Sequence, residues 1–77
     1  MPLVFEKEGF GFAFYSNDHK PIHVYVCKAG AEAIFDVDDE VELRESQVFK
    51  INDLNKAQRL AEENRGLIIQ KWNERLG

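Results

Sequence analysis

Cysteine, proline and long apolar runs are scarce in this chain of 77 residues. Its one cysteine, Cys27, excludes an intramolecular disulfide and a metal site built from several cysteines. No stretch approaches the roughly 20 apolar residues that a membrane-spanning helix needs. Residues 1–6 also lack the basic flank and apolar run of a signal peptide. We therefore expect a cytoplasmic protein that does not bind membranes.

Positive charge is also in short supply. The formal net charge is -4 at pH 7, and residues 1–52 carry five basic and ten acidic side chains. The acidic N-terminal part would be repelled by a phosphate backbone, and no stripe of lysine and arginine compensates for it. We expect no nucleic-acid binding by this chain alone.

The length indicates a single small domain over residues 1–77. A chain of this size buries only about 60% of the surface that it exposes when unfolded. Its hydrophobic fraction of 44% argues against disorder, which goes with low hydrophobicity. Such a domain holds one thin core and leaves little room for an enclosed active site.

The first half of the chain has the two-residue periodicity of β-strands. In residues 9–15, phenylalanines alternate with small residues, and further alternating runs cover residues 23–27 and 31–37. Residues 41–43 are a candidate fourth strand. Parallel strands need long crossover connections, and these segments follow one another closely. We therefore expect an antiparallel meander of three or four strands within residues 3–45.

The apolar period changes to that of a helix over residues 52–76. Asn52 is a suitable N-cap, and Asp53 suits the positive end of the helix dipole. One apolar stripe follows at helical spacing: Leu54, Ala57, Ala61, Ile68, Trp72 and Leu76. Residues 64–66 interrupt this stripe, so either one long helix passes through or two helices meet there. We favour one helix that bends near Gly66, because glycine costs about 1 kcal/mol in a helix interior.

The predicted fold is therefore α+β, with the C-terminal helix packed on one face of the sheet. The residues on the expected inner faces define the predicted core: Phe10, Phe12, Phe14, Val24, Val26, Phe35, Leu54, Ala61, Ile68 and Trp72.

Leu60, Leu67 and Ile69 lie outside the main helical stripe. They widen the apolar arc to roughly 200°, which is more than a surface helix needs to cover one sheet. Either a bend re-aims the second half of the helix, or the helix contacts something besides its own sheet. The second alternative makes Leu60 and Leu67 candidates for a partner interface, in a homodimer or with another protein.

Both histidines lie in one short segment before a predicted strand. His19 and His23 are four residues apart, a metal-binding spacing on a helix, but Pro21 between them disfavours a helix. In a turn, Asp18 or Glu32 would have to supply a third ligand. Zinc sites usually need three protein ligands, so the two histidines are weak metal candidates and we expect no cofactor.

The histidines are also candidate acid–base residues, because histidine titrates near neutrality. His19 and His23 would then serve a small hydrolase or nuclease-like toxin, with Tyr15, Tyr25 or Glu32 assisting. The competing interpretation is structural, with His19 bonding the backbone of its turn and His23 lying beside Tyr25. Because no complete catalytic set is present, a protein-interaction module is the leading prediction and an enzyme is the alternative.

The same segment carries a family resemblance. Residues 14–26 read Phe-Tyr-Ser-Asn-Asp-His-Lys-Pro-Ile-His-Val-Tyr-Val, and further similarity lies in residues 1–4, 32–35 and 62–74. Together these segments resemble a family of small bacterial domains of unknown function with the pattern FYSN(E/D)HxPxHVxV. The resemblance implies a small cytoplasmic protein, often encoded beside another short domain in proposed toxin–antitoxin-like pairs. Members commonly carry a third histidine where this chain has Tyr25, so a three-histidine site would be incomplete here.

Overall fold

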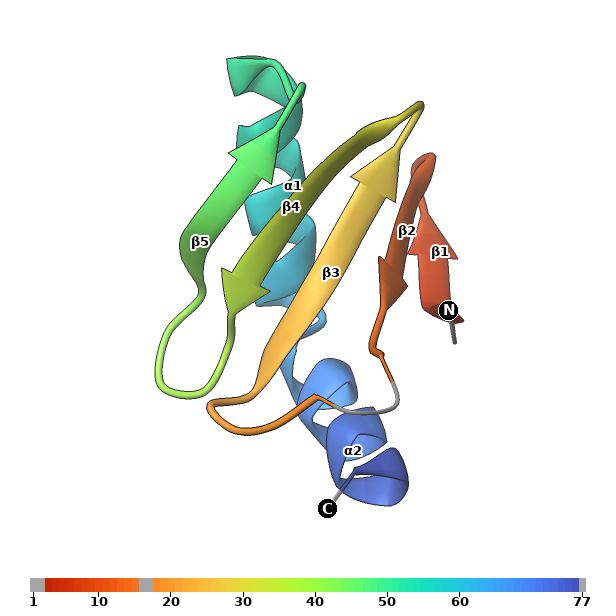
Figure 1. Cartoon of the computed structure of the whole chain (residues 1–77), viewed down its shortest axis with the longest axis vertical. Coiled ribbons are helices and arrows are strands. Elements are labelled where there is room, and N and C mark those ends of the chain that lie inside the picture. The colour runs from red at the N-terminus through yellow and green to blue at the C-terminus, as the bar shows by residue number, and fades with distance from the viewer. Residues whose placement is uncertain (1–2, 16–17, 77) are drawn as a thin grey trace.

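The computed structural model describes residues 3–15 and 18–76, which form one antiparallel sheet and two helices. The strands pair in sequence order: β1 (Leu3–Lys7), β2 (Phe10–Ala13), β3 (His23–Lys28), β4 (Ala31–Asp36) and β5 (Glu42–Gln47). The helices α1 (Ile51–Glu63) and α2 (Arg65–Arg75) lie on one side of this sheet (Figure 1). The α+β class and the antiparallel meander are confirmed, but the sheet has five strands rather than three or four.

The strand that the sequence pattern did not reveal is β1. Its five residues show no clear alternation of apolar and polar side chains, so tertiary pairing with β2 determines its conformation. Glu8 and Gly9, with φ angles of 53° and 85°, form a two-residue turn whose left-handed geometry matches the twist of the paired strands. The Phe5 and Phe12 rings then stack with their centroids 4.4 Å apart, which favours this register.

The core lies between the sheet and the helices. Its buried side chains come from both layers: Phe10, Phe12, Phe14, Ile22, Val24, Val26, Ala33, Phe35, Val37, Val41, Ala57, Leu60, Ala61, Ile68 and Trp72. Every predicted core residue is in this set except Leu54, which is partly buried and packs against it. Alternation identified the buried face correctly, because successive side chains of a strand point to opposite faces.

The helical region is divided at Asn64, whose φ of -111° departs from helical geometry. Both its backbone N–H and its side-chain amide donate to the carbonyl oxygen of Leu60, at 3.0 and 2.8 Å. Arg65 then donates from Nε to the carbonyl oxygen of Val37 at 2.7 Å, which ties the junction to the end of β4. The break therefore precedes the predicted bend near Gly66, which lies exposed within α2.

The break accounts for the wide apolar arc of residues 52–76, because each helix directs its own stripe into the core. Leu60 is fully buried from α1, while Ile68 and Trp72 are buried from α2. The placement of Leu60 on an exposed partner face is therefore wrong. Leu67 is 36% exposed and does lie on the surface.

Two smaller boundaries also differ from the prediction. α1 begins at Ile51 with Lys50 as its N-cap, rather than with Asn52 in that position. β5 extends to Gln47, past the predicted limit at residue 45. Over the described ranges, neither helix is long and apolar enough to cross a membrane.

Candidate functional site

His23 is the first residue of β3 and the centre of a buried polar contact at the α2 end of the sheet (Figure 1). Its Nδ1 lies 2.8 Å from the carbonyl oxygen of Pro21, and its Nε2 lies 3.4 Å from Oδ1 of Asp18. The other carboxylate oxygen of Asp18 accepts a hydrogen bond of 2.9 Å from the backbone N–H of Tyr15. These contacts tie both ends of the β2–β3 connection to the start of β3.

Both imidazole nitrogens of His23 face acceptors supplied by the protein. Nδ1 lies at hydrogen-bond distance from a backbone carbonyl oxygen, and Nε2 faces a carboxylate. In this conformation neither nitrogen is free to reach a substrate. A general acid or base needs a nitrogen within hydrogen-bond reach of the reacting group. The geometry therefore favours a structural role for His23.

Aromatic rings surround His23 on two sides. The centroids of the Tyr25 and Trp72 rings lie 5.6 and 5.2 Å from its own, and Tyr15 contacts Tyr25 edge to face at 4.4 Å. Burial raises the pKa of the Tyr25 hydroxyl above its usual 10.0, and the nearby Asp18 carboxylate raises it further. Tyr25 is consequently a weaker acid than free tyrosine.

The other two sequence-predicted site residues, His19 and Glu32, lie on the surface rather than buried with His23. His19 is exposed on the β2–β3 connection. Glu32 is exposed and pairs in register with Cys27, whereas His23 pairs with Asp36 at the other end of the β3–β4 ladder. In the parts of the chain that the structure describes, no three histidine, cysteine or acidic side chains gather closely enough to hold a metal ion.

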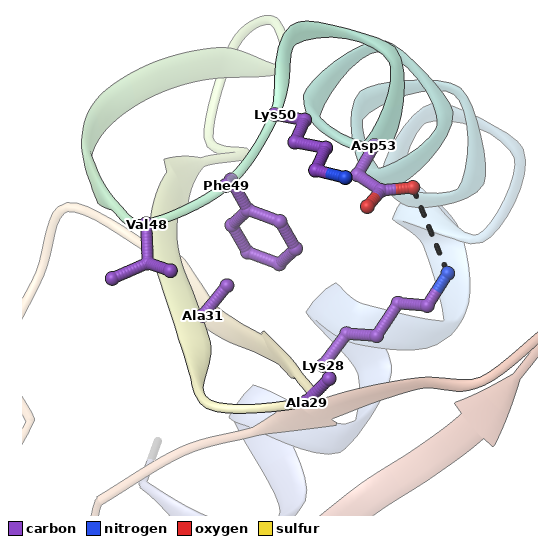
Figure 2. Close-up of a pocket in the computed structure, with 7 residues that line it drawn as sticks. All are labelled: Lys28, Ala29, Ala31, Val48, Phe49, Lys50 and Asp53. Atoms are coloured by element: carbon purple, nitrogen blue, oxygen red, sulfur yellow. Dashed lines mark ion pairs between the residues drawn. The ribbon is translucent and has the colours of Figure 1, made fainter.

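A second site lies at the opposite end of the sheet, where an open pocket has a volume of about 230 Å³ (Figure 2). The β3–β4 turn, the β5–α1 connection and the first turn of α1 form its walls. Its lining residues are Lys28, Ala29, Ala31, Val48, Phe49, Lys50 and Asp53. No local sequence pattern predicted this pocket, because its two walls come from distant segments that meet only in the folded chain.

Two lysines and one aspartate give the pocket a net positive charge. Lys28 is held by two contacts: its Nζ lies 3.6 Å from Oδ1 of Asp53 and 4.7 Å from the centroid of the Phe10 ring. The second contact is a cation–π interaction. Lys50 is exposed and extends along the other side of the pocket (Figure 2). The pocket is thus a local positive region on a chain whose net charge is -4.

Two strongly exposed apolar side chains lie in and directly after the β5–α1 connection. Val48 is 81% exposed and Ile51 is 72% exposed, the highest values among large apolar side chains in the described residues. Val48 has a φ of 73°, a left-handed conformation that β-branched residues rarely adopt. The neighbouring Phe49 turns inward and stacks against Phe10, with the ring centroids 6.1 Å apart. The β5–α1 connection therefore presents one apolar side chain to solvent and one to the pocket wall.

Comparison with known proteins gives a family for the chain and no function. No curated protein and no solved structure matches it. A family model matches residues 9–73, a range that contains both the His23 contact and the pocket. The chain belongs to the family described as "Domain of unknown function (DUF4160)".

Proposed function

We propose that this protein is a cytoplasmic protein-interaction module, acting as a homodimer or as one component of a pair with another small protein. The observation that carries the proposal is the exposure of Val48 and Ile51 beside an open pocket. Burying a side chain of this size is worth about 1.5 to 3 kcal/mol relative to leaving it in water. A single exposed apolar residue is ordinary, but two that are strongly exposed and close together in the chain, one of them lining a pocket, support an interaction surface.

The edges of the sheet support the pocket end as the interaction surface. All six residues of β5 are exposed, but this edge strand contains a register irregularity and carries Glu42, Arg44 and Glu45. β1, at the other edge, also contains a register irregularity. Bulges and charged side chains are the devices by which edge strands resist pairing with another chain. Docking through side chains at the pocket is therefore favoured over addition of a strand.

The resemblance to small domains that are encoded in pairs supports a different small protein as the partner, in a toxin–antitoxin-like pair. The alternative, a hydrolase or nuclease-like toxin using His19 and His23, has less support. His19 is exposed, whereas His23 is buried with Nδ1 against the carbonyl oxygen of Pro21 and Nε2 3.4 Å from the Asp18 carboxylate.

The proposal is tested by expressing a tagged chain at low level in its host and measuring its assembly. Mass spectrometry identifies proteins that co-purify in stoichiometric amounts, and light scattering gives the mass of the purified complex. The test variant is Val48→Asn combined with Ile51→Gln. The matched control is Leu3→Asn, because Leu3 is 47% exposed but lies on β1, at the far edge of the sheet.

We expect the wild type and Leu3→Asn to form the same dimer or complex, and the double variant to lose it. A monomeric wild type with no stoichiometric partner would contradict the proposal. So would a double variant that assembles as well as the wild type.

A further inference from the structure

We infer that the pocket beside Val48 receives one aromatic side chain of a different protein, from a segment in which carboxylates flank that aromatic residue. This inference rests on the proposed function and names the chemistry of the partner. It follows from the size of the pocket, the kinds of side chain that line it and the placement of aromatic residues in this chain.

The size of the pocket favours a single side chain as its occupant. Its volume is about 230 Å³. Sites for small molecules usually have volumes of about 300 to 1,000 Å³. Pockets that accept one aromatic anchor of a partner are, in contrast, a common centre of binding energy in protein interfaces.

The lining suits an aromatic ring in particular. Ala29, Ala31 and Val48 provide small or branched apolar contacts, and Phe49 provides a ring against which a second ring can pack. Aromatic pairs gain about 0.5 to 1.5 kcal/mol beyond the burial of their area.

The charge of the pocket indicates what flanks the anchor. Lys28 and Lys50 line it from opposite sides, and Asp53 is the one acidic residue of the lining (Figure 2). Asp53 already pairs with Lys28, so Lys50 contributes the excess positive charge. Carboxylates beside the aromatic anchor would complement that charge and align the segment at the pocket mouth.

A second copy of this chain does not provide such a segment in its folded form. Every aromatic side chain of the chain is described by the structure, and none of them is exposed. The aromatic residues that adjoin acidic ones, Phe5 and Phe35, are packed within the fold of their own chain: Phe35 is fully buried and Phe5 stacks on Phe12. The partner is therefore a different protein.

The conformation of Val48 adds an independent reason to expect binding here. A β-branched residue with a φ of 73° is strained, and its 81% exposure forgoes the benefit of burial. Neither the strained backbone of Val48 nor the exposure of its side chain stabilises the folded domain. Strained residues of this kind are concentrated at ligand contacts and other functional positions.

The test is an NMR titration of the isotope-labelled full chain with three synthetic peptides. The first is acetyl-Gly-Glu-Asp-Phe-Glu-Gly-amide, the second replaces its phenylalanine with alanine, and the third replaces its acidic residues with lysine. The first peptide should cause saturable shifts in the backbone amide signals of Ala29, Ala31 and Val48. The second and third should cause no saturable shifts there.

Two charge reversals on the labelled chain sharpen the test. Lys50→Glu should weaken binding of the acidic peptide by about three- to tenfold, the effect of losing one or two partly exposed ion pairs. Lys56→Glu is the matched control and should leave the affinity unchanged, because Lys56 is exposed on α1 and is not among the residues that line the pocket.

The inference is overturned if the acidic phenylalanine peptide gives no saturable shifts at the pocket, or if either control peptide binds as well. Loss of cellular assembly in the Val48→Asn/Ile51→Gln variant, together with such a negative titration, would leave the proposed function standing and reject only this partner chemistry. If the acidic peptide binds specifically but the Val48→Asn/Ile51→Gln variant assembles as well as the wild type, the proposed function is contradicted instead.

Discussion

The Nε2 atom of His23 lies 3.4 Å from Oδ1 of Asp18, and their side chains are only 6% and 7% exposed. This contact joins the β2–β3 connection to the start of β3. On another side, the His23 ring packs against Trp72 of α2 with the ring centroids 5.2 Å apart. The histidine therefore links the connection, the sheet and the second helix, and these contacts account for its burial.

Replacing His23 should destabilise the domain, whereas replacing His19 should not. His23→Ala removes the contact with the buried Asp18 carboxylate and the packing against Trp72, and should lower the free energy of unfolding by about 2 to 4 kcal/mol. His19→Ala changes an exposed side chain and should shift it by no more than about 0.5 kcal/mol. Urea denaturation followed by circular dichroism measures both. Equal effects of the two substitutions would contradict the structural role of His23.

The raised pKa of Tyr25 predicts a loss of stability at alkaline pH. Below the usual value of 10.0, the hydroxyl is protonated in the folded and unfolded states, so its contribution to stability is fully present. Between pH 10.0 and the higher pKa of the folded state, the Tyr25 hydroxyl loses its proton in the unfolded chain before it does so in the folded one. The free energy of unfolding therefore falls as the pH rises through this range.

This alkaline dependence is measured by denaturation between about pH 9 and 11, with Tyr25→Phe as the comparison. The wild type should lose more stability over this range than Tyr25→Phe, since the variant lacks the titrating hydroxyl. Absorbance titration of the phenolates should show one tyrosine ionising late. Identical pH profiles for the two proteins would refute the assignment.

Leu60 and Leu67 should respond differently to truncation. Leu60 is fully buried, so Leu60→Ala creates a cavity in the core and should cost about 2 to 5 kcal/mol. Leu67 is 36% exposed, and Leu67→Ala should cost less than about 1 kcal/mol. Thermal and urea melts of the two variants check this difference. A mild effect at Leu60 would mean that α1 packs on the sheet in another orientation.

Val48→Asn should stabilise the isolated domain slightly, by up to about 1 kcal/mol, because asparagine adopts a positive φ more readily than a β-branched residue. Val41→Asn is the matched comparison. Val41 is only 8% exposed, so that substitution buries a polar amide and should destabilise. Urea denaturation compares the two variants with the wild type. A destabilised Val48→Asn protein would show that Val48 is needed for folding, and loss of assembly in variants at this position would then need another explanation.

Local sequence patterns determined the class of this fold. The alternation of Phe10, Phe12 and Phe14 with small residues predicted which side chains of this segment enter the core, since side-chain direction in a strand alternates along the chain. It did not predict that Gly11 and Ala13, on the other face of β2, are buried as well. The apolar stripe that includes Ile68 and Trp72 predicted a helical region for the same kind of local reason. The His23 segment was correctly singled out as unusual, but its chemistry was not determined by its composition.

Tertiary structure decided the features that depend on distant partners. β1 acquires its strand conformation by pairing with β2, and the junction at Asn64 is held by the contact of Arg65 with Val37. Folding also brings Trp72 of α2 against the ring of His23, with the ring centroids 5.2 Å apart. The pocket beside Val48 exists only where two separate segments meet. Periodicity encodes which face of an element is apolar, but it does not encode which groups from other segments will meet that face.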